Sequence, residues 1–243
     1  MLAPSAEFPL LKRVRHIRPE ILLTELLSTS RRVAILMMDR EGTILLSNAF
    51  AARGYRHESA EAILGKNLRD VAHPEWAEER IGLARQCIET DKPVIVLQIS
   101  GGFRIRFRMT PIRLQPEDEH PSCMLLAGEE VSALGYKRIV SELVEGETVV
   151  HSKYVDLGPL DVLSTRELEV LALMREGHRT KDIAKMVHRS VSTIENHREN
   201  IGHKLGLQDR SKIINLANIA VLQVEDATRT RINIPFIKHL SVD

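Results

Sequence analysis

Short polar side chains follow one another closely near residue 190: Ser190, Ser192, Thr193 and Asn196. Hydroxyl and carboxamide groups of this length can reach base edges in a DNA groove, or the phosphates beside it. If a helix begins at Ser190, its first backbone amides also point toward an anionic partner. The chemistry that these residues favour is hydrogen bonding to a nucleic acid.

Capping residues predict four helices between residues 164 and 221. Ser164 and Glu167 fit a capping box, which begins the first helix. Ser190 stands where it can cap the third helix, and two short capped helices joined by a tight turn make a helix-turn-helix. The other boundary residues are Gly177, Thr180, Gly206 and Asp209, which end the first helix, cap the second, close the third and cap the fourth.

This segment resembles the LuxR-type DNA-binding domain along its whole length. The resemblance rests on Leu163, Ser164, Arg166, Glu167, residues 169–171, Gly177, residues 181–184, Ser190, residues 193–198 and residues 204–206. It implies that the third helix enters the major groove of double-stranded DNA and that the fourth helix forms a dimer contact. It also implies phosphate contacts from Lys181, His197, Arg198 and Lys204.

The charge of the segment is positive but small. The whole chain has a formal net charge of +1, whereas residues 164–221 hold ten Lys and Arg against seven Asp and Glu, an excess of three positive charges. Glu195 and Glu199 lie where a cation would help DNA binding most. Either they read cytosine amino groups, or they weaken non-specific binding and leave affinity to dimerisation.

The first half of the chain has a different pattern. It predicts a hairpin over residues 32–47, several short helices, a longer helix over residues 74–90, and three strands over residues 94–100, 103–111 and 123–127. Gly101 and Gly102 suit a tight hairpin turn because glycine tolerates positive φ. The predicted fold is α+β, with one antiparallel sheet followed by an all-α domain.

The first half resembles a PAS domain. The resemblance rests on Asp39, Gly42, Asn48, residues 65–68 and residues 90–93. It implies a five-stranded antiparallel sheet whose helical flank encloses a small molecule or an apolar core, in a module that senses a ligand, binds a cofactor or dimerises. Leu68 stands where flavin photoreceptors of this class have a cysteine, so a flavin–thiol adduct is not expected. The sequence requires no particular cofactor.

Three residues are candidates for ligand binding in this domain. Arg104 and Arg106 alternate with apolar residues in one predicted strand, and guanidinium groups bind carboxylates bidentately. The other interpretation of this pattern is a charged, solvent-facing sheet surface that discourages aggregation. Trp76 is the third candidate, although a tryptophan in an amphipathic helix is more often part of the core than a platform for a ligand.

These elements predict five segments and a homodimer. Apolar stripes at residues 131–144 and in a helix at residues 19–28 would favour self-association, which suits a protein that binds paired half-sites. The segments are an N-terminal helical flank (1–31), a PAS-like sensor or dimerisation domain (32–131), a connecting helix and linker (132–162), the LuxR-type domain (163–222) and a C-terminal tail (223–243).

Other classes of protein lack support in the sequence. It has no Gly-rich phosphate loop, no nucleophile motif and no His/Cys/Glu cluster with metal-ligand spacing, which argues against an enzyme or a metal site. The longest apolar run, residues 94–97, is far too short to cross a membrane, so we expect a cytoplasmic protein. We therefore predict a sequence-specific DNA-binding transcription regulator. Its first domain either senses a small molecule or serves only for protein interaction.

Overall fold

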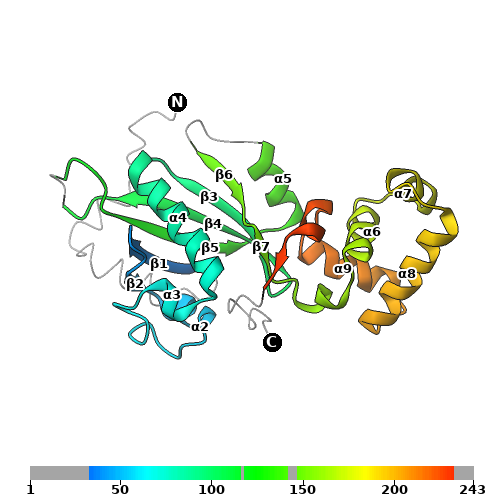
Figure 1. Cartoon of the computed structure of the whole chain (residues 1–243), viewed down its shortest axis with the longest axis horizontal. Coiled ribbons are helices and arrows are strands. Elements are labelled where there is room, and N and C mark those ends of the chain that lie inside the picture. Colours follow the sequence, from blue (N-terminus) through cyan, green and yellow to red (C-terminus); the bar gives the residue numbers. More distant parts are fainter. Residues whose placement is uncertain (1–32, 116–117, 142–146, 233–243) are drawn as a thin grey trace, which may run out of the picture.

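The computed structural model describes residues 33–115, 118–141 and 147–232. The predicted helix at residues 19–28 and most of the predicted tail lie outside these ranges. Within them, a sheet domain precedes a group of helices, as Figure 1 shows. The predicted α+β class, with an all-α domain at the C-terminal end, is confirmed. No helix in the described ranges is long and apolar enough to span a bilayer.

The sheet has six strands in the order β2-β1-β5-β4-β3-β6. Neighbouring strands are antiparallel except for the last pair, because β6 runs parallel to β3. The strands are β1 (Ala34–Asp39), β2 (Ile44–Ser47), β3 (Val94–Ser100), β4 (Phe103–Ile112), β5 (Cys123–Glu130) and β6 (Thr148–His151).

The five predicted antiparallel strands, β1 to β5, are therefore present, and β6 is a sixth strand that the sequence did not predict. Strand β6 lies in a segment that the sequence pattern suggested to be a linker, since it has no stable period. Its β-branched residues suit a strand, and they pair with the outer edge of β3, where Val96 lies beside Val150. The pairing depends on an edge that forms elsewhere in the chain, which a local pattern does not reveal.

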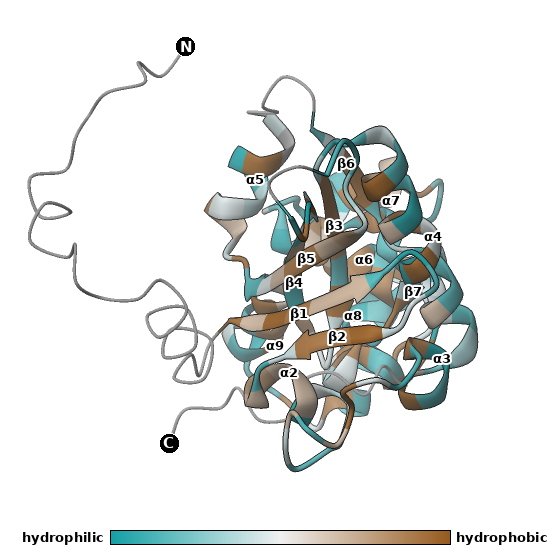
Figure 2. Ribbon diagram, turned by 90° about the vertical axis from the view of Figure 1, so that its left-hand side faces the viewer, coloured by the Kyte–Doolittle hydropathy of each residue, from teal (hydrophilic) through white to brown (hydrophobic). Residues whose placement is uncertain are grey.

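Helices cover one face of this sheet. They are α2 (Ala49–Gly54), α3 (Leu68–Val71) and the long α4 (Pro74–Thr90), and their buried residues form one core with the facing strand residues. Figure 2 shows β1 and β2 as hydrophobic strands next to α2. The Asn48 side chain caps α2 and also bonds to the backbone of Val33 and Ile35. Helix α5 (Ala133–Ser141) follows β5.

The C-terminal part has its own core. It is built from α6 (Thr165–Arg175), α7 (Thr180–Met186), α8 (Val191–Leu205) and α9 (Arg210–Ile219), with the short 3-10 helices η2 (Gly158–Val162) and η3 (Val224–Thr228). The four predicted helices are present. The predicted cap of the second is wrong, because Arg179 holds the cap position and Thr180 is the first helical residue.

The segment between the two cores is tightly packed. Strands β7 (Tyr154–Val155) and β8 (Thr230–Arg231) pair in parallel, and Figure 1 shows them with η3 between the sheet and the helices. The outer face of β3 contributes Ile99 to the second core. Gly158 has a φ of +53°, and a Cβ there would lie 2.5 Å from the Gly101 carbonyl carbon. A glycine is therefore needed where the junction crosses the β3–β4 turn.

Candidate functional site

The helix-turn-helix is held together by side-chain contacts that fix its helices. Ser190 accepts a hydrogen bond from the Thr193 amide at 3.1 Å and so caps α8. His188 in the preceding turn has a φ of 52°, the left-handed conformation that lets the chain reverse between α7 and α8. Arg198 donates to the Thr180 hydroxyl at 2.6 Å, which joins the middle of α8 to the start of α7.

One face of α8 is buried and the other is polar and exposed. Ile194 and Ile201 lie in the core. The exposed residues recur at helical spacing and form a continuous stripe along the helix. They are Ser192, Glu195, Asn196, Glu199, Asn200 and His203.

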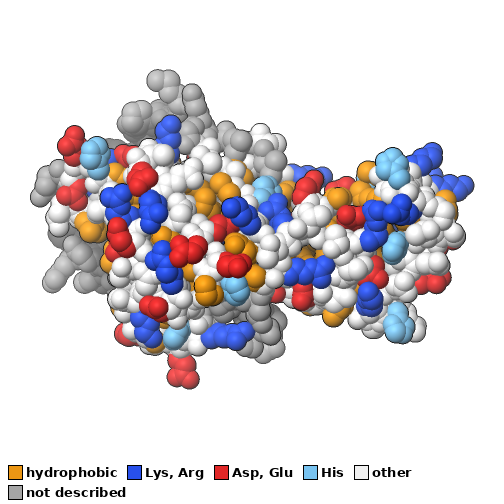
Figure 3. Space-filling model, in the orientation of Figure 1, with side chains coloured by type: hydrophobic (Ala, Val, Ile, Leu, Met, Phe, Trp, Pro, Cys, Tyr) orange, Lys and Arg blue, Asp and Glu red, His pale blue; other side chains and the backbone are white. Residues whose placement is uncertain are grey.

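The structure places most of the predicted DNA-binding residues on or beside this stripe. Lys181 is exposed in the first turn of α7, and Ser190 is exposed at the start of α8. Thr193, His197 and Arg198 are half-buried at its border. Figure 3 shows Lys, Arg and His side chains gathered over the lobe formed by the helices.

Glu195 and Glu199 are exposed, and in the part of the chain that the structure describes neither takes part in an ion pair. Both carboxylates therefore remain available to a hydrogen-bond donor outside the chain.

Lys204 has a different setting from the other predicted cations. Its ammonium group lies 2.8 Å from Glu167 Oε2, and the Glu167 side chain is 5% exposed. The same carboxylate accepts from the Ser164 amide at 2.7 Å, which completes the capping box of α6. Burial raises the pKa of Glu167, but the hydrogen bonds from Lys204 and Ser164 outweigh it and lower the pKa below its usual value. Lys204 thus ties the end of α8 to the start of α6, and its charge is already compensated.

The ligand candidate Arg104 is fully engaged within the protein. It is 1% exposed and forms an ion pair with Asp226 of η3. Its Nε donates to the Ala220 carbonyl at 3.2 Å and its Nη2 to the Val221 carbonyl at 3.0 Å. The Tyr136 ring of α5 lies 5.2 Å from the guanidinium carbon. Arg104 therefore joins the sheet to the C-terminal helices and has no group left for a ligand.

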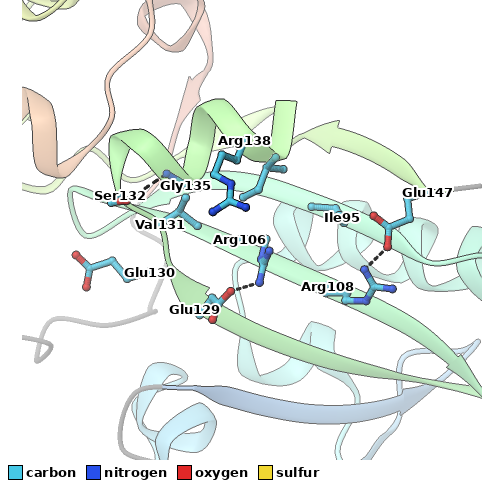
Figure 4. Close-up of a pocket in the computed structure, with 11 residues that line it drawn as sticks. Ile95, Arg106, Arg108, Glu129, Glu130, Val131, Ser132, Gly135, Arg138 and Glu147 are labelled. Carbon is cyan, nitrogen blue, oxygen red and sulfur yellow. Dashed lines mark hydrogen bonds and ion pairs between the residues drawn. The ribbon is translucent and has the colours of Figure 1, made fainter. Parts of the chain in front are cut away.

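Arg106 lines an open pocket of about 470 Å³ between α5 and the sheet, drawn in Figure 4. It forms an ion pair with Glu129 on β5, and Arg108 forms one with Glu147. The predicted alternation along β4 is present, since Ile105 and Phe107 lie in the core on the opposite face. Because the pocket supplies its own carboxylates, it does not favour an anionic ligand.

The third candidate, Trp76, is in the sensor core. It is 2% exposed, and its Nε1 donates to Gln98 Oε1 at 3.2 Å. The same oxygen accepts from Arg80, which is 1% exposed. The sequence analysis missed Arg80 and Gln98. A signal was present, since Arg80 lies four residues after Trp76 and four before Ala84, on the apolar face of the helix.

A helix-turn-helix joined to a sheet with a helical flank defines a class: a DNA-binding module behind a PAS-like domain. Residues 161–217 match the model of the bacterial regulatory proteins of the luxR family. This segment is a LuxR-type DNA-binding domain, and the sheet domain before it resembles a PAS domain.

Two known proteins are similar to this chain over different extents. The oxygen regulatory protein NreC of Staphylococcus aureus is 35% identical over 79 residues, which are 32% of this chain. The chain spans 36% of the length of that relative. The solved complex of Vibrio cholerae VqmA with ligand and DNA aligns with 88% of this chain and 93% of that one, at 18% identity and a TM-score of 0.51. This second similarity supports the fold of both parts in one chain.

Proposed function

We propose that the protein is a cytoplasmic, homodimeric transcription regulator that binds specific DNA through α8, with a PAS-like domain that senses a small molecule. The observation that carries the proposal is the exposed polar stripe of α8 in a LuxR-type domain. The stripe begins at the amides of a helix N-terminus, which attract phosphate, and its side chains have the length and polarity to read base edges.

The residues of this surface have separate roles in the proposal. Ser192, Thr193 and Asn196 hydrogen-bond to base edges, with Asn196 suited to adenine. Glu195 and Glu199 accept from cytosine amino groups. The remaining contacts go to phosphates, which position the helix without reading sequence; they come from Lys181, Ser190, His197 and Arg198, with a smaller share from Lys204 because Glu167 compensates its charge.

A selection of random double-stranded DNA by the full-length protein tests this function. We expect a two-fold symmetric motif whose affinity falls as salt rises. Asn196→Ala removes the preference at one position of each half-site. Asn200→Ala is the matched control, because Asn200 is exposed on the same stripe one turn further along but has no base contact in the proposal, so the motif should stay intact. Binding without any sequence preference would refute the proposed function.

Dimerisation has a separate test. Leu134 on α5 is 70% exposed, which is unusual for a leucine outside an interface. Two copies of a short recognition helix gain affinity through their effective concentration on paired half-sites. We expect sedimentation of the full chain to show a dimer that Leu134→Glu weakens. Leu114→Glu, at a leucine that is 53% exposed in the β4–β5 connection, is the control. A monomer at all concentrations would contradict the homodimer.

The alternative is a PAS-like domain that serves only for protein interaction. The two versions differ in the sensor core, because an interaction module has a self-sufficient core. In the described part of the core, three buried nitrogens have no hydrogen-bond partner, Arg80 Nε, Arg80 Nη1 and Gln98 Nε2, and this favours ligand sensing.

A further inference from the structure

Arg80 projects from α4 into the interior of the PAS-like domain. Its guanidinium carbon lies 5.1 Å from the centroid of the Trp76 ring and 5.0 Å from that of the Phe107 ring. Trp76 comes from the same helix, and Phe107 comes from the face of β4 that packs against it. The two rings hold the guanidinium in place, and cation–π attraction compensates part of its lost hydration.

Donors outnumber acceptors around this group. Among the described residues, the acceptor that these donors share is Gln98 Oε1, which takes hydrogen bonds from both Trp76 Nε1 and Arg80 Nη2. Three nitrogens remain without a hydrogen-bond partner in the described ranges: Arg80 Nε, Arg80 Nη1 and Gln98 Nε2. Buried polar groups in folded proteins are nearly always paired, so three orphaned donors in one cluster require an explanation.

The charge of Arg80 is only partly compensated, because Glu79 and Tyr55 raise its pKa by less than burial lowers it. Across the described residues no carboxylate forms an ion pair with it. Glu79 acts on it only at longer range, because its oxygens accept from Ser152 Oγ at 2.6 Å and Lys153 N at 2.7 Å. Burial lowers the pKa of Arg80 to about 10, which leaves it charged near neutral pH.

An anion with two neighbouring acceptor atoms would pair with the unpaired donors and also balance the charge of Arg80. A carboxylate meets both needs, since the guanidinium fork matches its two oxygens. The flanking rings would cover the apolar part of such a molecule. Tyr55 lies beside the cluster, with its ring 6.3 Å from that of Trp76, and burial raises its pKa to about 12, so its hydroxyl keeps its proton.

We propose that Arg80 and Gln98 form the recognition end of a site for a small organic carboxylate in the core of the PAS-like domain. The inference rests on the proposed sensing function and names the class of ligand. Arg80 holds the carboxylate, and the Gln98 amide donates to it while its oxygen continues to orient Trp76. The outward-facing arginines of β4 take no part, because protein carboxylates already occupy them.

The test measures the melting temperature of the full-length protein with acetate, pyruvate and benzoate, each against its neutral amide. We expect at least one acid to raise the melting temperature with rising dose, and its amide to bind at least about tenfold more weakly. Arg80→Met should abolish the effect of the acid. Arg80→Lys keeps the charge but loses the fork, so it should weaken binding and still fold. Arg106→Met, on the opposite face of the sheet, is the matched control.

Three results would overturn the inference. They are no shift with any acid in the wild-type protein, equal shifts with acid and amide, and shifts that persist in both Arg80 variants. The DNA selection described above separates this failure from that of the proposed function. A protein that recovers a symmetric motif but ignores carboxylates is still a DNA-binding regulator, with a different ligand or none.

Discussion

Two buried arginines, Arg80 in the sensor core and Arg104 at the junction with the helices, have opposite surroundings. Both are 1% exposed. Arg104 has a carboxylate, two carbonyl oxygens and a ring around it. Arg80 has one amide oxygen and two rings, and two of its nitrogens are without partners within the described residues. A buried charge is tolerated when its surroundings compensate it. Arg104 already has a paired counter-charge, whereas Arg80 lacks one in the described part of the chain.

The difference separates a structural contact from a binding site. At the junction the protein supplies the counter-charge itself, which fixes the sheet against η3 and the end of α9. In the core it supplies donors and leaves the acceptor to another molecule. The two sites also lie on opposite faces of the sheet. Gln98 pairs with Ile105 in register, and Arg104, the residue before Ile105, faces the second core. A ligand at Arg80 would therefore act on the sheet that Arg104 connects to the helices.

The largest effect is expected from removing the counter-charge of Arg104. Asp226→Asn keeps the shape of the side chain but leaves the guanidinium buried and unpaired, which costs about 3–5 kcal/mol of unfolding free energy. Urea unfolding of the full chain measures it. Glu225→Gln, at the exposed neighbouring position, is the control and should change stability little. If the two variants were equally stable, the ion pair at the junction would have no structural role.

Removing both charges of the junction should cost less than removing one. In the double variant Arg104→Met, Asp226→Leu neither member of the pair is left buried alone, so we expect it to recover about 1–3 kcal/mol relative to Asp226→Asn. Arg229, whose Nε lies 3.1 Å from Asp226 Oδ1, loses its counter-charge in both variants and does not affect the comparison. A double-mutant cycle with both single variants measures the coupling. Additive losses would show that the two side chains act independently, through packing alone.

The opposite sign is expected at Arg80. Arg80→Met removes a buried charge that has no ion-pair partner in the described chain, so the unliganded protein should be as stable as the wild type, or more stable by about 1 kcal/mol. Urea midpoints without added carboxylate measure this. A loss as large as that of Asp226→Asn would mean that the two rings and Gln98 already satisfy Arg80, and the contrast between the two arginines would disappear.

Local patterns were sufficient to predict some of these features and insufficient for others. Capping residues predicted α6 and α8, because a cap depends on residues three positions apart. The alternation along β4 correctly predicted that Arg104 and Ile105 lie on opposite faces of the sheet. Neither pattern could reveal what covers Arg104, because Asp226 lies 122 residues away. Strand β6 was not predicted because its partner, the edge of β3, is also distant in the sequence. The exposed residues of α8 were predictable as a face of a helix, whereas their contacts with DNA stay a prediction.

The smallest effect is expected at a third site, the ion pair in which Lys204 is exposed and Glu167 is buried. Its hydrogen bonds lower the pKa of Glu167 below the ordinary 4.5. The stability that Glu167 contributes is therefore present above that value and is lost as the pH falls through the lowered pKa. Lys204 is 41% exposed, so solvent screening keeps its share below about 1 kcal/mol. Lys204→Met should lose less stability than the wild type between about pH 6 and pH 3. If both proteins lost the same stability as the pH fell, the hydrogen bond from Ser164 alone would account for the lowered pKa of Glu167. A counter-charge would then stabilise this protein only where both partners are buried.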